Sequence, residues 1–600
     1  MTQFLAALWT SGEERADEQQ NRLRAQLRDD LDWSVAFETS GSWIACPATR
    51  RAPLRSTAQG SGVVIGGLFE AGSSRPAPVR LDDICQPTPL SIAGQLLQRY
   101  WGRYVALLPD DSTGSFSVFR DPSGGVECLI WRFGWLTLAS SDTRPLLRFR
   151  PTALAVDWTL VGAILREPLV STATSPLTDV HLLTPGALCH ADRPDAEIQL
   201  WRPATFARRR VTDPEQALDT LKASVEQSVA AHGKSPGPTV VEISGGLDSA
   251  IVSSTLKKAA DAEVTAWINF AVDQPGGDER AYAQTVAGHL GVGLTTYLKP
   301  ALDLNPAELE ATAGEVRPSF VAFDTHYDIT LANECRRTGA ARIMTGQGGD
   351  AVFYQPPSSL PFADHLQRLG LPALHSPHLV DVARWTRRST WGVLRTALVA
   401  LAGYGPSPAA PPPPYLSRRL RRRTSTVGRH PWLADLSSLP PAKRVHIRNL
   451  ADGLTLSGHA RRAEIAELIH PLLSQPVMEA CLSIPVDILV QGGRDRALAR
   501  LAFADRIPEL ILNRRSKGET NAYYGRAMAN AVGWLRPYLL DGVLAANGLL
   551  DRPLLEATLS EEHLAWHGGF ADLGMTICLE AWARRWSAYL APAAYEAGPS

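Results

Sequence analysis

The sequence predicts an α/β protein with a β-rich first part and a doubly wound parallel sheet in its larger second part. After residue 206, short apolar runs alternate with amphipathic stretches, the pattern of parallel strands joined by crossover helices. Before residue 205, short apolar runs are separated by turn sequences, which is typical of β-rich domains. Because 600 residues are too many for one core, we place a boundary near residue 205, which gives domains 1–205 and 206–600.

Composition excludes several classes of function. The chain has 60 basic and 61 acidic residues, so its net charge of −1 argues against a nucleic-acid partner and against a polybasic membrane anchor. The seven cysteines include no CxxC pair, which argues against a disulfide framework or a structural zinc site and favours a reducing compartment. No run of 18 apolar residues is present, and the first 20 residues do not form a signal peptide. We therefore expect a cytoplasmic protein without a membrane partner.

The first domain is predicted to consist mainly of short strands with some helices. Apolar runs predict strands at 62–69, 104–108 and 115–119, and turn sequences rich in Asp, Ser, Pro and Gly stand between and after them. The segment Trp201-Arg202-Pro203 and the arginines 208–210 that follow mark the junction to the second domain.

The second domain begins with a helix, capped by Asp213 with Pro214 in its first turn. The continuous apolar run 239–243 is typical of a buried parallel strand. The elements predicted after it are helix 250–260, strand 264–272, helices 278–290 and 324–337, and strand 341–345. From about residue 360 the pattern is helical, and the proline-rich stretch 405–415 is predicted to be extended or disordered rather than packed.

The segment Ser244-Gly245-Gly246-Leu247-Asp248-Ser249 lies between the predicted strand 239–243 and the next helix. Backbone amides of a glycine turn at a helix N-terminus bind anions, and glycine lets phosphate oxygens approach the backbone closely. Asp248 would repel phosphate, so we expect it to hold a cation, for which Mg²⁺ is the natural candidate. The segment lacks the Gly-Lys-Ser/Thr of a γ-phosphate-transferring loop.

A second loop of the same kind is Thr345-Gly346-Gln347-Gly348-Gly349-Asp350, which follows the predicted strand 341–345. Ligands of open α/β sheets bind at the carboxyl ends of the strands, so Asp350 is expected to face Asp248 there. Two carboxylates with Mg²⁺ would neutralise a departing pyrophosphate.

These motifs resemble the pyrophosphate loop of ATP pyrophosphatases and, together, the synthetase domain of the asparagine synthetase family. The resemblance implies cleavage of ATP between its α and β phosphates and activation of a carboxylate as its adenylate. Arg514-Arg515-Ser516-Lys517-Gly518 resembles the family's late lysine motif, which implies a catalytic Lys517 at the reacting phosphate, in a chain with only seven lysines. The residues that the resemblance assigns to ATP and pyrophosphate are Ser244, Gly245, Gly246, Asp248, Ser249, Phe270, Val272, Thr345 and Gly346.

The first domain resembles the family's glutamine amidotransferase half, an Ntn-type sandwich, at Gly66-Gly67-Leu68-Phe69, at Phe119–Gly124 and at Pro185-Gly186. That half uses an N-terminal cysteine as its nucleophile, whereas here the chain reads Met1-Thr2-Gln3 and its first cysteine is Cys46. We therefore expect the domain to have lost glutamine hydrolysis and to act as a scaffold, with Thr2 a weak alternative nucleophile.

Among relatives without that cysteine, the chain most resembles lasso peptide cyclases. Gln347 stands where asparagine synthetase has Glu and β-lactam synthetase has Tyr, and Ser474 stands where asparagine synthetase has an Asp of its Arg-x-Pro-Phe-Leu-Asp motif. The resemblance implies ATP-dependent macrolactam formation in a precursor peptide, with Asp248, Gln347, Asp350 and Lys517 as the catalytic residues. It also implies a leader peptidase as partner.

Three points stay open at the level of sequence. The chain is alternatively a small-molecule amide or β-lactam-type synthetase of the same family, or a nucleotide-binding scaffold without chemistry. The general base for the amine is unassigned, with Asp324, His326 and Glu519 as candidates. The peptide sequence, ring size, acceptor residue and oligomeric state are not given by the sequence.

Overall fold

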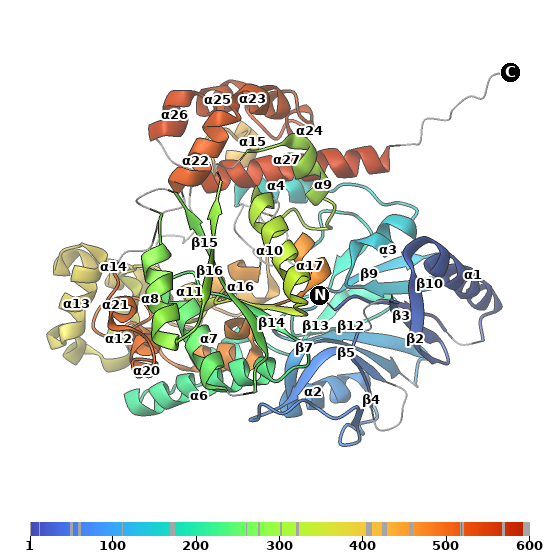
Figure 1. Ribbon diagram of the computed structural model, residues 1–600, viewed down its shortest axis with the longest axis horizontal. Coiled ribbons are helices and arrows are strands. Elements are labelled where there is room, and N and C mark those ends of the chain that lie inside the picture. The colour runs from blue at the N-terminus through green and yellow to red at the C-terminus, as the bar shows by residue number, and fades with distance from the viewer. Residues whose placement is uncertain are drawn as a thin grey trace.

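The strands of this computed structural model form three sheets among the residues that the structure describes (Figure 1). The described residues are 2–10, 12–48, 52–57, 62–110, 112–167, 174–259, 261–273, 277–300, 303–319, 323–403, 411–422, 429–454, 460–515, 518, 521–566 and 570–591. Two sheets use strands that precede residue 200, and the third uses strands between residues 239 and 469.

The first two sheets are almost wholly antiparallel. Six strands form one sheet, in the order β11 (Val180–Leu182), β9 (Leu129–Phe133), β10 (Leu136–Ser140), β1 (Leu5–Leu8), β3 (Ser42–Pro47) and β2 (Trp33–Thr39). Seven form the other, in the order β13 (Arg193–Gln199), β12 (Ala187–His190), β8 (Ser115–Arg120), β7 (Tyr100–Asp110), β5 (Val63–Glu70), β4 (Leu54–Thr57) and β6 (Arg80–Leu81). The β4–β6 pair alone is parallel among these described strands.

Apolar side chains hold these two sheets face to face. Ile44 and Ile130 of the first sheet share a buried cluster with Ile65, Leu107 and Val118 of the second. The outer faces are covered by helices, because α1 (Glu14–Leu31) packs on the first sheet and α2 (Pro89–Arg99) on the second. The result is a helix–sheet–sheet–helix arrangement.

The third sheet is fully parallel and confirms the predicted α/β class. Its order is β16 (Leu294–Lys299), β15 (Val264–Val272), β14 (Thr239–Glu242), β17 (Arg342–Met344) and β18 (Glu467–Ile469). Three of these strands were expected. The sequence analysis missed β16, whose apolar and polar residues mix at the sheet edge, and β18, which has only three residues.

Helices cover both faces of this sheet (Figure 1). One face carries α6 (Pro214–Gly233), α7 (Leu247–Lys258) and α8 (Arg280–Leu290), and the other carries α10 (Thr325–Thr338) and α17 (Arg461–Ile465). Asp213 caps α6 by accepting a hydrogen bond from the Gln216 amide at 2.8 Å. Helix α7 begins three residues before the expected start, which places Asp248 in its first turn.

The described residues contain further helices. They are α3 (Thr143–Arg148), α4 (Trp158–Arg166), α5 (Pro203–Ala207), α9 (Pro306–Thr312), α11 (Gly349–Val352), α12 (Leu360–Leu369), η2 (Leu371–His375), α13 (Pro377–Thr386), α14 (Thr390–Leu401), α15 (Arg418–Arg422), η3 (Pro431–Leu433), α16 (Pro441–Gly453), η5 (Pro471–Leu473), α18 (Gln475–Ser483), α19 (Val486–Leu489), α20 (Ala497–Ala502), α21 (Glu509–Leu512), α22 (Asn521–Asn530), α23 (Val532–Leu540), α24 (Val543–Ala546), α25 (Arg552–Thr558), α26 (Glu561–Trp566) and α27 (Phe570–Leu590).

The proline-rich stretch 405–415 departs from its prediction at its C-terminal end. Residues 404–410 lie outside the described part of the chain, but Pro413 is buried. Tyr415 and Leu416, which follow it, belong to the large cluster that contains α4 and α27. The apolar side chains after the prolines therefore draw this end of the stretch into the core, whereas the composition indicated no packing.

Polar contacts tie the antiparallel part to the parallel sheet and to the helices around it. Arg103 of β7 forms an ion pair with Glu467 of β18 at 3.0 Å, and the indole N–H of Trp201 donates to Glu479 of α18 at 2.8 Å. All seven cysteines are free, and only Cys85 is exposed. No helix within the described ranges is long and apolar enough to cross a membrane.

Candidate active site

The two glycine-rich loops follow adjacent strands, β14 and β17, at the point where the strand order of the parallel sheet reverses. From β14 the chain continues outward to β15 and β16, and on the other side of β14 lie β17 and β18. Open α/β sheets bind their ligands in the crevice at such a point. The fold therefore brings both sequence motifs to the place where a ligand is expected.

The first loop, Ser244–Ser249, is fixed by its own hydrogen bonds. The Ser249 hydroxyl donates to the Gly246 carbonyl at 3.1 Å and accepts from the Ser244 amide at 3.2 Å. Gly245 has a φ of +85°, and a Cβ there would lie 2.9 Å from the Ala283 amide nitrogen, so only glycine fits. The loop opens α7, whose N-terminus presents backbone amides.

The second loop presses directly against the first. A Cβ on Gly346 would lie 2.4 Å from the Ser249 amide nitrogen, and one on Gly349 would lie 2.3 Å from Cγ of Asp248. The hydroxyl oxygen of Thr345 accepts a hydrogen bond from the Gln347 amide at 3.1 Å and lies 2.8 Å from Nδ1 of His470. Glycine at these positions is what lets Asp248 and Asp350 approach each other.

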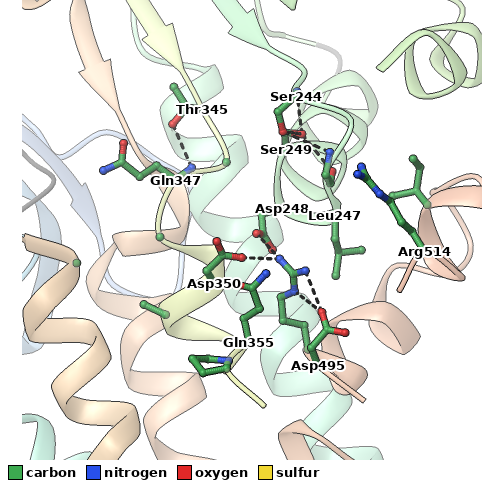
Figure 2. Close-up of a pocket in the computed structure, with 18 of the residues that line it drawn as sticks. Ser244, Leu247, Asp248, Ser249, Thr345, Gln347, Asp350, Gln355, Asp495 and Arg514 are labelled. Carbon is green, nitrogen blue, oxygen red and sulfur yellow. Dashed lines mark hydrogen bonds and ion pairs between the residues drawn. The ribbon is translucent and has the colours of Figure 1, made fainter. Parts of the chain in front are cut away.

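A guanidinium lies between these two carboxylates. Nη1 of Arg496 is 2.7 Å from Oδ2 of Asp248 and 2.6 Å from Oδ1 of Asp350. Figure 2 shows the dashed contacts of Asp248 and Asp350 meeting at one guanidinium nitrogen. Although burial opposes its charge, the two carboxylates raise the pKa of Arg496, so it stays fully charged.

Neighbouring residues hold Arg496 in place. Its φ is +52°, in the left-handed region that a non-glycine residue seldom adopts. Asp495 contacts both Arg496, at 2.9 Å, and Arg500, at 3.0 Å. Burial favours the neutral acid, but these two arginines outweigh it and lower the pKa of Asp495. Arg496 could not be predicted from the sequence, because no local motif marks this loop and its two partners Asp248 and Asp350 lie about 150 or more residues away.

The late basic segment lies beside the first loop. Arg514 donates to the Gly245 carbonyl at 3.1 Å, pairs with Glu279, and stacks 3.9 Å over the ring of Tyr282. The amide of Gly518 donates to the same Glu279 carboxylate at 2.7 Å. Lys517 lies outside the described residues, and its predicted role remains a prediction. Arg514 and Gly518, on either side of it, are anchored next to the first glycine loop.

A cavity of about 940 Å³ joins these groups. The cavity is lined by residues of both loops: Ser244, Gly246, Asp248, Ser249, Thr345, Gly346, Gln347 and Asp350. Gly245, which was also predicted to bind the nucleotide, does not line the described cavity. The cavity continues past Gln355 to Trp385 and Arg387 at the end of α13. Ligand pockets commonly measure about 300–1,000 Å³, so this one is large enough for a nucleotide and part of a second substrate.

Phe270 and Val272, expected to contact the nucleotide, lie at the carboxyl end of β15 but do not line this cavity. Phe270 packs against Tyr297 at 5.6 Å and Tyr327 at 4.6 Å between ring centroids, and Val272 is buried in the core. Of the two, Phe270 contacts Tyr327, which does line the cavity.

Asp324 and His326, two of the residues considered as general bases, do not line the described cavity. Asp324 caps α10 and pairs with Lys299, and His326 is absent from the described lining. Glu519 lies outside the described residues. Glu242 also lines the cavity, as do Glu279 and Asp495, and the sequence pattern indicated for Glu242 only a place in a strand.

The first domain places Thr2 against the parallel sheet. Thr2 is buried, and its hydroxyl donates to Glu467 of β18 at 3.4 Å. Cys46 is fully buried, and burial raises the pKa of Cys128 to about 12, so Cys128 is not available as a thiolate nucleophile. These contacts suit a structural role for this part of the chain.

The donor set fits Mg²⁺. Two carboxylates on separate loops converge within hydrogen-bond distance on a single cationic nitrogen, so they are spaced to share one cation. Mg²⁺ usually takes one or two protein carboxylates and completes its shell with water and phosphate oxygens. No group of three or more His, Cys, Asp or Glu side chains within the described ranges forms a metal site by itself.

Fold and site together define an α/β protein with paired glycine loops and facing carboxylates at the switch point of a parallel sheet. Residues 220–584 match the asparagine synthase family, and this chain belongs to that family. It is 30% identical over 220 residues to asparagine synthetase B [glutamine-hydrolyzing] of Escherichia coli (strain K12), which covers 32% of this chain and 37% of that relative. The chain thus aligns with little more than a third of that relative's length.

A solved structure of the allosteric regulatory enzyme of purine biosynthesis is 11% identical, covering 57% of this chain and 83% of that one, with a TM-score of 0.16. A likeness this weak carries no argument about function.

Proposed function

We propose that this protein is an ATP-dependent, AMP-forming amide ligase that closes a macrolactam in a ribosomally made precursor peptide. The observation that carries the proposal is the convergence of Asp248 and Asp350 on one cation, beside a glycine loop that opens a helix, in a chain of the asparagine synthase family. This arrangement suits cleavage of ATP between its α and β phosphates.

In the first step, the pyrophosphate loop binds and orients the nucleotide. The amides at the start of α7 and the hydroxyls of Ser244 and Ser249 offer donors to phosphate oxygens. A side-chain carboxylate of the peptide attacks the α-phosphorus, the bond to the β-phosphate oxygen breaks, and pyrophosphate departs. Asp248 and Asp350 would hold Mg²⁺ with the phosphate oxygens, and its charge would neutralise the departing pyrophosphate.

Cationic side chains around the loop complement the charge that develops. Arg496, Arg500, Arg514 and Arg515 line the described cavity. Lys517, in the segment anchored by Arg514 and Gly518, is the proposed contact to the reacting phosphate, where a point charge on a flexible stem can follow the transition state.

In the second step, the N-terminal amine of the peptide attacks the acyl carbon. The carbon–nitrogen bond forms, the carbon–oxygen bond to the adenylate breaks, and AMP leaves. The enzyme contributes by holding amine and carbonyl at reacting distance, which is worth several powers of ten in rate. Gln347, at the cavity wall, cannot titrate and is proposed to bind substrate by hydrogen bonding.

Two features support a substrate-borne amine and a substrate of peptide size. Six of the seven cysteines are buried, so none of these six is exposed as a nucleophile for glutamine hydrolysis. The cavity also runs beyond the loops to α13, which leaves room next to the nucleotide. A leader peptidase that trims the precursor is the proposed partner.

The test follows nucleotide and peptide together. The full-length protein is incubated with Mg·ATP, the precursor peptide encoded beside it and the matching leader peptidase. AMP, pyrophosphate and a peptide one water lighter than its trimmed form would support the proposal. AMP formed only with a small amino-acid derivative would favour a small-molecule amide synthetase. ADP, or no turnover of nucleotide, would contradict an AMP-forming ligase.

The site variants give a second test. Asp248→Ala and Lys517→Ala are each expected to lower AMP formation at least about 100-fold, because each removes charge placed for the transition state. Unchanged turnover in either variant would contradict the assigned mechanism. If the wild type itself turned over no ATP, the alternative of a nucleotide-binding scaffold without chemistry would be favoured.

A further inference from the structure

Glu242 is a carboxylate that lines the cavity and is not one of the two carboxylates proposed to hold Mg²⁺. It is the last residue of β14, two positions before Ser244, and it lines the same cavity as the two glycine loops. Its side chain lies on the face of the sheet that α10 and α17 cover, as its contact with Tyr327 shows. A negative group here would repel phosphate, so the nucleotide itself gives no reason for it.

The carboxylate is held in one orientation by Tyr327. The phenol of Tyr327 donates to Oε2 of Glu242 at 2.8 Å, and this is the one hydrogen bond to that carboxylate within the described ranges. The ring of Tyr327 is itself clamped, with Phe270 at 4.6 Å on its edge and the Arg462 guanidinium 4.9 Å from its centroid.

The nearby cations are engaged elsewhere. Arg462 is bound to Asp328 at 2.8 Å, and Lys299, 5.0 Å from the ring of Tyr327, is paired with Asp324. Neither forms an ion pair with Glu242 among the described contacts, so the carboxylate lacks a cationic partner in direct contact.

The surroundings of Glu242 favour the binding of a proton by its carboxylate. Burial raises the pKa of its carboxyl, the Tyr327 hydrogen bond and the charges of Arg462 and Lys299 oppose this rise, and Asp324 adds to it. A carboxylate of raised pKa binds a proton more readily than an exposed one, which is the property required of a general base.

We propose that Glu242 binds the ammonium group of the attacking amine and accepts its proton, with Tyr327 as the positioning residue. This proposal rests on the proposed ligase function and assigns a binding subsite to the amine. The amine binds there in its protonated, cationic form. The ammonium gives one proton to Glu242, and the freed lone pair forms the bond to the acyl carbon. The electrons of the carbon–oxygen bond leave with AMP, and the second proton of the nitrogen passes to water.

The experiment separates the two half-reactions. Exchange of labelled pyrophosphate into ATP reports carboxylate activation, and the mass of the peptide reports lactam formation. The substrate is the leader-free precursor peptide, used both with its free N-terminus and with an acetylated one. The wild type is expected to catalyse exchange with both peptides and to form lactam only from the free amine.

Glu242→Gln is expected to keep exchange within about threefold while lactam formation falls at least about 100-fold, the usual loss for a general base. Its AMP is then released by hydrolysis of the adenylate, so AMP exceeds lactam. Tyr327→Phe is expected to shift the AMP-to-lactam ratio in the same direction by a smaller factor, and Glu242→Asp to restore part of the lactam.

The chain provides a matched control pair outside the cavity. Tyr297 donates to Glu334 at 2.7 Å, also on α10, and neither residue lines the cavity. Glu334→Gln and Tyr297→Phe are expected to leave the AMP-to-lactam ratio at the wild-type value. Lactam formation by Glu242→Gln at the wild-type rate would overturn the role of Glu242 but not the ligase proposal. An equal loss of the rates of pyrophosphate exchange and lactam formation in this variant would do the same. Failure of the wild type to catalyse any exchange would overturn the ligase proposal itself.

Discussion

Asp248 and Asp350 accept hydrogen bonds from the same nitrogen of Arg496, although they follow two different strands of the parallel sheet. In this state a side chain of the protein supplies the positive charge that the two carboxylates need. A divalent cation at the same place would have to share the carboxylates with the guanidinium or displace it.

Arg496→Met should destabilise the free protein and create a metal site. The side chains of Arg496 and Asp248 are only 8% and 13% exposed, so removing the cation leaves two facing carboxylates and costs about 3 kcal/mol of unfolding free energy. Added Mg²⁺ or Mn²⁺ should recover part of this stability, and Mn²⁺ binding without nucleotide, followed by electron paramagnetic resonance, should tighten relative to the wild type.

Arg536→Met is the control for that variant, because Arg536 and Glu556 form an exposed ion pair worth less than about 1 kcal/mol. Equal stability losses in the two variants, with no gain in Mn²⁺ binding for Arg496→Met, would contradict the bridging role.

Gly346→Ala should separate the two loops. Its Cβ would lie 2.4 Å from the Ser249 amide nitrogen, which belongs to backbone and cannot turn away. We expect the affinity for ATP to fall at least about tenfold by isothermal titration, since a shift of about 1 Å at an active site often costs far more than this.

Gly288→Ala, on the exposed side of α8, is the matched glycine substitution. No atom lies within 4 Å of a Cβ there, so the alanine should raise stability by about 0.5–1 kcal/mol and leave ATP binding unchanged. Wild-type ATP affinity in Gly346→Ala would show that the loops do not need this close approach.

His232 should make the protein sensitive to acid. Burial, with the charges of Arg103 and Arg342, lowers the pKa of His232 to about 3, while Glu467 opposes this shift. Below about pH 6.5 the unfolded chain binds a proton that the folded state refuses, so stability falls as the pH drops from about 6.5 towards 3. Each such histidine contributes at most about 1.4 kcal/mol per pH unit.

His232→Leu should therefore flatten the dependence of unfolding free energy on pH between 4.5 and 6.5 by up to that slope. Urea unfolding at several pH values measures it. The rings of Phe69 and Trp101, which contact His232, accept an apolar replacement. An unchanged slope would mean that His232 titrates alike in both states.

Arg103 and Glu467 should be energetically coupled across the two parts of the molecule. Their side chains are 10% and 27% exposed and 3.0 Å apart. A double-mutant cycle with Arg103→Met and Glu467→Gln, read by unfolding, should give a coupling of about 1–2 kcal/mol. Strictly additive losses would assign the contact no net role.

The sequence predicted those parts of the site that are local in the chain. The strand, glycine turn and helix around Ser244–Ser249 form one continuous segment, so their pattern shows directly. Arg496 is different, because its role depends on partners brought together only by the sheet and its own segment has no motif. Glu242 was hidden for another reason, since a single acid in an apolar strand is read as part of the strand until the fold shows which face it occupies.

The same limit explains the missed strands. Strand β18 has three residues and pairs with β17 across more than a hundred residues of helices, so no local period marks it. By contrast β15 was predicted with its observed bounds, because nine consecutive residues carry the strand pattern.

The long gap between β17 and β18 also has a consequence for synthesis on the ribosome. All strands of the two antiparallel sheets precede residue 200, so they can pair early, and domains generally form in the order in which they emerge. The cavity cannot form until β18, Arg496 and Arg514 have left the exit tunnel. Between the emergence of Asp350 and that of Arg496 the nascent chain holds Asp248 and Asp350 without their arginine, which makes this the period in which the protein depends most on ions or chaperones around it.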